Sequence, residues 1–527
     1  MEDLFLKFKL KDNQEFSQTL DTFLNNYASV TKFEFLDQEN FRSQIWEAVL
    51  LHLKNKEEVL VHQKCLSTLR ILSRDKTSLD SILTQENLNL ILEYAGLNCK
   101  QENYFVTTVT NETQKLLCNI LFNSTKVQNM ILETNCLACV IDRISKYDSD
   151  VQHDTKLFDV RVIFLISALI PSTRSIIINE LHGDITLINL LDSCSKYINM
   201  EERNIYANDA VLSSEILKAL FNLFIEQKDP SAEEFKSYIN LLCIVKNLLL
   251  SENAKDNENL VSNVVNLLTV IPTSYYIKLI APALKLDEQN NSVDEANADM
   301  TVVNVLLQFL NDKLDCKTSL IENMSPILTC LIKMCRAERL IRKYIRMQVL
   351  PPLKDVMKRP EEGSTLRNKL CKLLTTPLTE VRDLNAEFLF VLCKEKVGRM
   401  IKYTGYGNAA GMFANKGLLG PDHAKVDYSS ESEDSDTEEY EQYKDHINPV
   451  IGCYEKPKSN PFEGMTEEQK EYEAMKLVSL VDQLQRGGII QPCTVGDDGK
   501  PKAIEHVLEL KEKLPKQQIH KRDSDTD

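Results

Sequence analysis

Arginine and lysine residues recur at helical spacing late in the apolar part of this sequence. The residues of this basic stretch are Arg336, Arg339, Arg342, Lys343 and Arg346. Positions 336, 339, 343 and 346 follow the i, i+3, i+7, i+10 pattern that predicts one face of a helix. Only Glu338 offsets their charge. Such a face is either simply solvated, or binds carboxylates through charge-assisted and bidentate hydrogen bonds.

A second basic pair, Arg70 and Arg74, has the i, i+4 spacing of one helix face. The whole chain is acidic, with a net charge of −16 from 62 basic and 78 acidic residues, so both basic faces stand out. If they line the concave side of a curved helical array, they form a groove for a peptide that bears carboxylates. Asn123 and Asn222 are then either groove-lining amides that hold a ligand backbone, or exposed or capping asparagines.

Hydroxyl groups within an acidic stretch provide candidate modification sites. Residues 427–445 hold nine acidic residues and one lysine. Ser430 and Ser435 are each followed three positions later by a glutamate, Glu433 and Glu438, which is the spacing that an acid-directed Ser/Thr kinase recognises. The alternative is a solubilising acidic spacer. Because like charges repel and apolar residues are scarce, we expect a disordered linker here.

Motifs for covalent chemistry, metals or cofactors are missing from the sequence. It lacks H-E-x-x-H, G-x-x-x-x-G-K-[ST] and G-x-S-x-G. Cys136 and Cys139 form one C-x-x-C without a second pair, so we expect buried thiols, no metal and no cofactor. The glycines of residues 404–411 do not match G-x-G-x-x-G and favour a turn or cap that closes the helical array. The acidic balance argues against a nucleic-acid partner.

The elements that position these residues are predicted to be helices. The 15 Gly and 16 Pro make up about 6% of 527 residues, which argues against turn-rich folds. Blocks with apolar residues at helical spacing recur at 65–76, 115–126, 215–224, 327–336 and 385–396. The triplet Leu-Phe-Asn occurs at 121–123 and 220–222, two units of about 50 residues apart, which is near armadillo and HEAT repeat lengths. The alternative is a non-repetitive all-α protein.

The predicted organisation is all-α: an armadillo/HEAT-type solenoid over residues 1–423, an acidic disordered linker over 424–464, an amphipathic helix over 465–486 and a mostly flexible tail over 487–527. Thr466 and Gln469 match a capping box. The apolar stripe of this helix is Ala474, Leu477, Val478, Val481 and Leu484. This helix either folds back on the solenoid or binds a partner groove. The longest apolar runs are too short to span a bilayer, and a cytosolic protein is expected.

Several segments resemble the synembryn family. They are LPPLKDV (350–356), AEFLFVLC (386–393), IKYTGYGNAAG (401–411), DTEEY (436–440) and MTEEQKEYEAMKLV (465–478). Weaker similarity continues upstream through LRILSRDK (69–76) and LCNILFNS (117–124), so the resemblance covers most of the chain. It implies an armadillo/HEAT superhelix with an acidic linker and a carboxyl-terminal helix. It also implies a guanine-nucleotide exchange factor and folding chaperone for heterotrimeric G-protein α subunits.

The resemblance further implies that a concave groove captures the carboxyl-terminal helix of a GDP-bound or nucleotide-free Gα subunit without βγ. The positions that match the family's tail-binding residues are Arg70, Arg74, Asn123, Arg339, Arg342 and Lys343; Asn222, Arg336 and Arg346 are further groove candidates. Ser430 and Ser435 resemble the family's activating phosphorylation sites. Recruitment to the plasma membrane or cell cortex would occur through Gα. The alternative function is a cytosolic helical-repeat scaffold without exchange activity.

Overall fold

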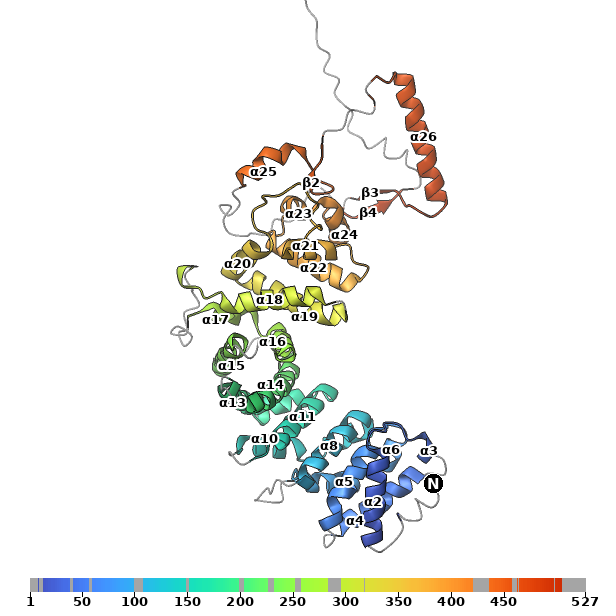
Figure 1. Ribbon diagram of the computed structural model, residues 1–527, viewed down its shortest axis with the longest axis vertical. Coiled ribbons are helices and arrows are strands. Elements are labelled where there is room, and N and C mark those ends of the chain that lie inside the picture. The colour runs from blue at the N-terminus through green and yellow to red at the C-terminus, as the bar shows by residue number, and fades with distance from the viewer. Residues whose placement is uncertain are drawn as a thin grey trace, which may run out of the picture. The chain divides into compact units, whose positions relative to one another are not determined.

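The computed structural model describes residues 8, 13–37, 41–55, 59–98, 108–147, 151–198, 203–225, 232–251, 257–282, 295–316, 318–419, 436–456, 462, 464–496 and 498–504. These residues are mostly helical, and their strands form two short antiparallel hairpins (Figure 1). The predicted all-α helical-repeat class is confirmed. The chain divides into two compact units, residues 1–306 and 307–527.

The first unit consists of helices. Its elements are α2 (Asn13–Tyr27), α3 (Glu34–Asp37), α4 (Phe41–Lys54), α5 (Val59–Leu72), α6 (Leu79–Ile82), α7 (Gln85–Tyr94), α8 (Thr108–Asn123), α9 (Thr125–Ile131), α10 (Cys136–Ser145), α11 (His153–Leu169), α12 (Thr173–Ser175), the π-helix η2 (Ile176–Glu180), α13 (Gly183–Ile198), α14 (Arg203–Phe224), α15 (Ala232–Leu250), α16 (Glu258–Val270), the 3₁₀ helix η4 (Thr273–Tyr275), α17 (Tyr276–Ile280) and the 3₁₀ helix η6 (Glu295–Asn297). Helix α18 (Thr301–Asp315) spans the boundary of the two units.

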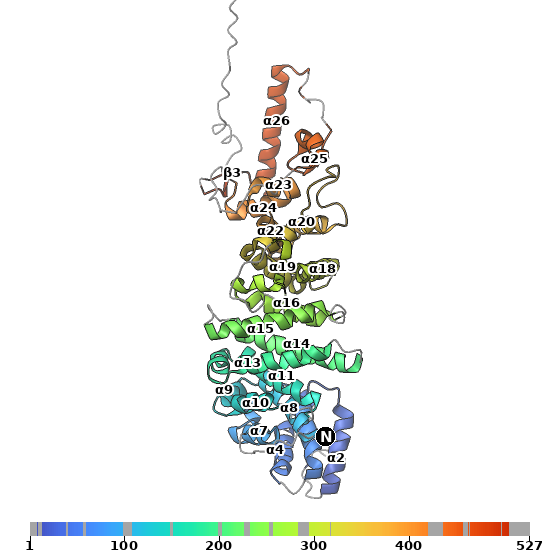
Figure 2. The same ribbon diagram turned by 90° about the vertical axis from the view of Figure 1, so that its left-hand side faces the viewer.

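Helix pairs repeat along this unit, as Figure 2 shows for successive helices. One helix of each pair packs against the equivalent helix of the next, and these ladder helices are α2, α5, α8, α11, α14 and α16. Each ladder helix from α5 to α16 also packs against its own partner, which is α4, α7, α10, α13 or α15. The blocks 65–76, 115–126 and 215–224 lie on or at the ends of ladder helices, as the repeat hypothesis requires. Stacking is needed because one helix pair cannot cover its own apolar face.

The second unit continues with helices and adds the two hairpins. Its elements are α19 (Leu320–Ala337), α20 (Arg339–Val349), α21 (Leu366–Leu373), α22 (Thr379–Leu392), α23 (Val397–Thr404), α24 (Tyr406–Lys416), α25 (Glu438–Tyr443), the 3₁₀ helix η7 (Lys444–His446), β1 (Ile447–Asn448), β2 (Cys453–Tyr454), α26 (Glu467–Arg486), β3 (Cys493–Val495) and β4 (Pro501–Ala503). Helices α19 and α22 pack against each other and contain most of the blocks 327–336 and 385–396. Strand β1 pairs with β2, and β3 pairs with β4.

The predicted turn in the glycine-rich segment 404–411 is present at Gly405 only, and the segment does not close the helical array, because helix α24 follows it. Helix α23 ends at Thr404, Gly405 has φ +75°, and α24 begins at the next residue. Gly452 has φ +69°, and a Cβ added to it would lie 3.0 Å from the Cα of Gly405. The amide of Gly407 donates to the carbonyl of Val450 at 2.8 Å. These two chain segments therefore approach each other at backbone distance.

The prediction of a disordered linker throughout 424–464 is wrong for residues 436–456, which we call the clasp. Thr437 caps α25, and its hydroxyl donates to the carbonyl of Leu353. Lys402 pairs with Asp436 and lies 4.3 Å from the ring centroid of Tyr440. Composition suggested disorder because the segment is acidic, but lysine and backbone groups elsewhere in the unit supply its partners. Ser430 and Ser435 lie outside the described residues.

The amphipathic helix is present as α26. Thr466 and Gln469 form the predicted capping box, with the Gln469 amide donating to Thr466 Oγ1 at 3.3 Å. No described side chain of α26 is buried. Its most exposed large apolar residues are Tyr472, Met475, Leu477, Leu480 and Leu484. Whether this helix folds back or binds a partner stays open.

Among the residues that the structure describes, no single helix is long and apolar enough to cross a membrane. The pair Glu258–Val270 and Thr273–Ile280 meets the length and composition criteria together, but is bent by 117°.

Candidate binding groove

A basic pocket opens on the ladder helices of the first unit. Its volume is about 420 Å³, and it is lined by Arg70, Arg74, Lys115, Cys118, Asn119, Phe122, Phe158, Arg161 and Leu165. These residues come from α5 and the turn that follows it, from α8, and from α11. The structure thus brings Arg70 and Arg74 together, as expected. It adds Lys115 and Arg161, which sequence reasoning missed.

A sequence signal for these two missed cations does exist. Lys115 follows Arg70 by 45 residues, and Arg161 follows Lys115 by 46. This interval is close to the repeat length, so each repeat places one basic side chain at an equivalent position along the ladder helices. Lys115 Nζ lies 5.4 Å from the ring centroid of Phe158, and the guanidinium carbon of Arg161 lies 5.3 Å from it. The aromatic ring therefore interacts with two cations of adjacent repeats.

Carboxylates at equivalent positions hold the cations at two steps of the ladder, between α5 and α8 and between α11 and α14. Glu112 accepts from Arg70 Nε at 2.7 Å and from Lys115 Nζ at 3.1 Å. Glu215 accepts from Arg161 Nε at 2.9 Å and from Lys218 Nζ at 3.2 Å. Burial alone would raise the pKa of each carboxyl group, but the surrounding cations and hydrogen bonds lower both pKa values overall. These carboxylates are therefore ionised and orient the cations above them.

Arg74 differs from the other cations of the pocket. It donates to the carbonyl oxygens of Ala28 at 2.6 Å and Val30 at 3.3 Å, and within the described residues no carboxylate pairs with it. Burial lowers the pKa of Arg74, and the like charge of Arg70 lowers it further. Two guanidinium groups that repel each other gain when an anion enters between them. Phe122, 66% exposed, provides an apolar contact at the same pocket.

Asn123 and Asn222 occupy equivalent places at the ends of α8 and α14. Asn123 Nδ2 donates to the carbonyls of Ser73 at 2.8 Å and Arg74 at 3.3 Å. Asn222 Nδ2 donates to the carbonyl of Phe164 at 3.2 Å and to Ser167 Oγ at 3.2 Å. Both amides thus satisfy groups near the end of the preceding ladder helix, which is the capping alternative. Asn123 also fixes the backbone from which Arg74 extends.

The expectation that 336, 339, 343 and 346 share one helix face is wrong. Helix α19 ends at Ala337, Glu338 is extended, and α20 begins at Arg339. The sequence offered no Gly or Pro at this break, so the helical spacing appeared continuous. Arg336, on α19, pairs with Glu387 at 2.8 Å and with Glu395 at 3.3 Å.

The basic residues of α20 divide by burial. Arg342 is buried and donates to the carbonyl of Cys335 at 2.7 Å, which satisfies an end of α19. Arg346 is also buried, with Nη2 at 3.5 Å from Tyr403 Oη. Arg339 is exposed and Lys343 is half-buried. The two basic sets belong to different compact units, so a single groove lined by both stays a prediction.

The two cysteines of the C-x-x-C pair differ in state. Burial raises the pKa of the free Cys136 thiol to about 12. Cys139 is disulfide-bonded, so the expectation of two buried thiols is wrong for this residue. Among the described ranges, no cluster of three or more His, Cys, Asp or Glu side chains could hold a metal ion.

Stacked helix pairs with a basic pocket on their ladder helices define a helical-repeat binding protein. A family model described as guanine nucleotide exchange factor synembryn matches residues 65–500. The chain is 36% identical over 567 residues to Chaperone Ric-8 of Drosophila pseudoobscura pseudoobscura, covering 97% of this chain and 98% of that protein. It is 37% identical over 536 residues to Chaperone Ric-8A of Xenopus tropicalis, covering 98% of each. The chain therefore belongs to the synembryn family of guanine nucleotide exchange factors and chaperones, as the resemblance implied.

Two solved structures show weaker similarity. An engineered protein aligns with a TM-score of 0.45 and 14% identity, covering 80% of this chain and 95% of that one. A designed armadillo repeat protein in complex with peptide (KR)4 aligns with a TM-score of 0.36 and 13% identity, covering 50% of this chain and 98% of that one.

Proposed function

We propose that this chain is a non-receptor guanine-nucleotide exchange factor and folding chaperone for Gα subunits, and that its basic pocket binds the Gα carboxyl-terminal tail. The observation that carries the proposal is the convergence of Arg70, Arg74, Lys115 and Arg161 at one pocket. A tail that ends in a free carboxylate supplies the anionic partner that Arg74 does not find among the described residues. Phe122 offers an apolar surface for side chains that precede the carboxylate.

Exchange requires no covalent chemistry in this proposal. The exchange factor binds nucleotide-free Gα more tightly than GDP-bound Gα. GDP and the exchange factor therefore lower each other's affinity for Gα by the same ratio. Removal of the tail helix from its place in Gα loosens the loop that holds the guanine base. GTP then restores the closed state and releases the factor. The same preference explains chaperoning, because a bound, poorly folded Gα is protected until nucleotide locks it.

Further contacts complete the proposed complex. The exposed apolar residues of α26 are suited to bind the Gα nucleotide-binding domain near its switch region. Arg339 and Lys343 are the basic residues of α20 that remain candidates for a Gα contact. We propose phosphorylation of Ser430 and Ser435 by an acid-directed kinase as regulation, and recruitment from the cytoplasm to the cell cortex through Gα.

The test is GDP release from purified monomeric Gα with and without the protein. We expect acceleration by the wild-type chain, and loss of at least about tenfold for Arg74→Glu, because charge reversal repels the tail carboxylate. The matched control is Lys196→Glu, an exposed lysine on α13 outside the pocket, which should retain wild-type activity. Gα lacking its tail should not respond.

The alternative scaffold function makes a different prediction. A scaffold would bind Gα or another protein without changing the rate of GDP release. Equal rates for Arg74→Glu and wild type would show that the pocket is not the tail site, whereas no acceleration by either protein would contradict exchange activity itself.

A further inference from the structure

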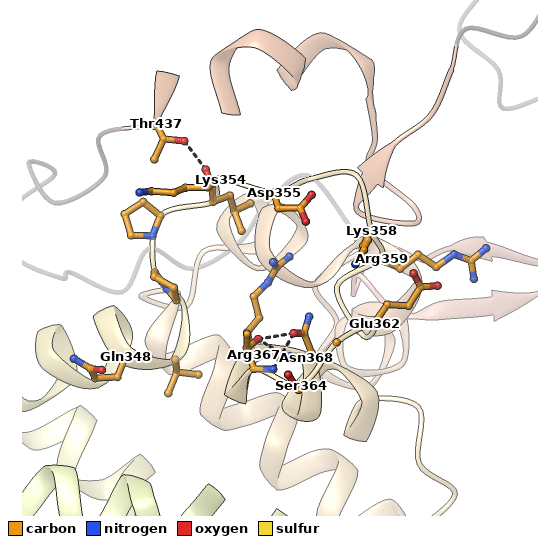
Figure 3. Close-up of a pocket in the computed structure, with 16 residues that line it drawn as sticks. Gln348, Lys354, Asp355, Lys358, Arg359, Glu362, Ser364, Arg367, Asn368 and Thr437 are labelled. Carbon is orange, nitrogen blue, oxygen red and sulfur yellow. Dashed lines mark hydrogen bonds between the residues drawn. The ribbon is translucent and has the colours of Figure 1, made fainter. Parts of the chain in front are cut away.

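A larger cavity lies in the second unit. Its volume is about 720 Å³, and its walls are the segment between α20 and α21, the start of α21, and Thr437 of the clasp (Figure 3). Four cationic residues line it: Lys354, Lys358, Arg359 and Arg367. Two carboxylates, Asp355 and Glu362, also line it, so the positive charges are in excess.

Three of the four cations of this cavity lack a side-chain hydrogen bond or ion pair within the described part of the chain. Lys354, Lys358 and Arg359 are exposed, and none of them makes an ion pair or a side-chain hydrogen bond there. The carboxylate of Asp355 accepts instead from the backbone amide of Met357 at 2.9 Å. These three side chains are therefore available to a ligand without first breaking an internal contact.

Arg367 is the most constrained cation. Its Nε donates to the carbonyl of Tyr403 at 2.9 Å, and among the described residues no carboxylate lies within ion-pair distance of its guanidinium group. Burial lowers the pKa of Arg367, although the nearby carboxylates of Asp355 and Glu361 act in the opposite direction. The side chain extends from α21 into the cavity, toward the loop segment that carries Asp355 (Figure 3). A desolvated guanidinium group gains strongly from a bound anion.

The helix behind Arg367 favours the same charge. Helix α21 begins after Thr365, which caps it together with Asn368. Ser364 and Thr365 line the cavity, so the positive end of the helix dipole adds to the side-chain charges there. This contribution is auxiliary, because the four cationic side chains supply most of the positive charge.

We propose that this cavity binds a small ligand with clustered phosphomonoester groups, either a soluble inositol polyphosphate or the headgroup of a phosphoinositide lipid. Planar guanidinium groups and lysine ammonium groups together suit several phosphates at once. The volume is within the range of small-ligand sites and exceeds the need of a single phosphate. Among the described residues of the lining there is no Phe, Tyr or Trp to stack a nucleobase, which favours a polyol phosphate over a nucleotide.

Ligand binding would also fasten the clasp. Thr437 forms part of the wall, and its hydroxyl already donates to the carbonyl of Leu353 on the opposite segment. A ligand that contacts both walls binds only the closed arrangement, so it shifts the equilibrium toward it. Amide hydrogen exchange of residues 350–365 and 436–456 should therefore slow when ligand is present.

Calorimetric titration of the full chain with inositol hexakisphosphate tests the site. We expect saturable binding, weakened by at least about tenfold in the double variant Lys354→Gln/Lys358→Gln, because two charge-assisted contacts are lost. The control Lys372→Gln/Lys396→Gln removes two exposed lysines of the same unit outside the cavity, and should change affinity by less than about twofold. All four substituted lysines are exposed, so the variants should fold normally, which melting temperatures would verify.

Three results would overturn the proposal. The first is absence of binding at about 1 mM ligand. The second is equal weakening by the cavity and control variants, which would indicate diffuse charge attraction. The third is ligand-induced protection that omits both residues 350–365 and 436–456.

Vesicles distinguish the two ligand sources. Phosphatidylcholine vesicles with and without phosphatidylinositol 4,5-bisphosphate would be sedimented with wild type and with Lys354→Gln/Lys358→Gln. Cavity-dependent sedimentation, competed by inositol hexakisphosphate, would assign a lipid headgroup. Cavity-dependent binding of the soluble probe without sedimentation would assign a soluble inositol phosphate. Sedimentation that the cavity variant does not reduce would count against the cavity as the lipid site.

Discussion

Glu112 balances the charges of the basic pocket at the scale of single residues. Its carboxylate joins Arg70 and Lys115 and also accepts from Ser67 Oγ at 2.9 Å. Because the pocket must keep cations close together before any ligand arrives, this carboxylate reduces their mutual repulsion. It also restricts the Arg70 side chain to one orientation, which lowers the entropy lost when a ligand binds.

We predict that Glu112→Gln destabilises the first unit at neutral pH by about 2 kcal/mol, the usual cost of losing hydrogen bonds to charged partners. The folded-state pKa of Glu112 lies below its ordinary value of 4.5, so the ionised form adds stability above that pH. This contribution disappears as the pH falls from 4.5 through the folded-state pKa. Denaturant titrations of variant and wild type should therefore converge in acid.

The matched control for this prediction is Glu86→Gln. Glu86 pairs with Lys54 at 2.6 Å, but its side chain is 75% exposed, so solvent screens the pair. The control should lose less stability than Glu112→Gln. An equal loss in both variants would contradict the special role of Glu112.

The clasp illustrates the scale of elements. Gly405 precedes α24, and Gly452 lies between β1 and β2, so their close approach joins two elements that are distant in sequence. Any side chain at either position must enter the space of the other backbone. Glycine suits both positions, because φ is positive there and the two backbones approach each other closely.

Gly452→Ala should loosen the clasp and cost about 1–3 kcal/mol, because its Cβ would lie 2.8 Å from Pro360 Cγ and the backbone is left-handed. Faster amide hydrogen exchange across residues 436–456 is the expected measurement. Gly464→Ala is the control, since its φ is +85° but no atom lies within 4 Å of the added Cβ. If both variants behave alike, left-handed strain rather than close approach explains the effect.

At the scale of the whole first unit, buried polar groups connect helices of adjacent repeats. Asp159 on α11 pairs with Arg143 on α10, and also accepts from Gln114 on α8 and from Tyr147 Oη at 2.6 Å. Arg143 and Asp159 are almost completely buried. Because repeats contact only their neighbours, such a network couples the stability of adjacent repeats.

Asp159→Asn should destabilise the first unit by about 3–5 kcal/mol, since it leaves the buried Arg143 without a charged partner. We expect a lower melting temperature and faster hydrogen exchange in α8, α10 and α11 together. Asp142→Asn, which breaks the exposed pair with Lys146, is the control and should cost less than about 1 kcal/mol. Loss of protection in α11 alone would contradict coupling through Asp159.

Local signals predicted much of the fold correctly. The apolar period located the helices α5, α8, α14, α19 and α22, because each must bury one face and the spacing of apolar residues records that face. The capping box of α26 and the turn at Gly405 were also readable, since both depend on residues close in sequence. The resemblance to the synembryn family rested on whole segments and was confirmed.

Candidate sites were predicted less completely, because partners are chosen by packing. The spacing of Arg70 and Arg74 indicated a basic face, but their neighbours Lys115 and Arg161 arrive from other repeats. Arg342 has the same charge as Arg339, yet it is buried. It donates to the carbonyl of Cys335, which lies near the end of α19 and needs a donor there. Charge alone could not separate these roles.

The order of residues thus determined the helices, their repetition and the acidic balance of the chain, since these depend on local preference and composition. Tertiary structure alone decided which cations share a pocket, where the clasp attaches and which arginines are enclosed. The physical reason is that burial and pairing depend on groups tens of residues away, whose approach is selected by the packing of whole helices rather than by any short stretch of sequence.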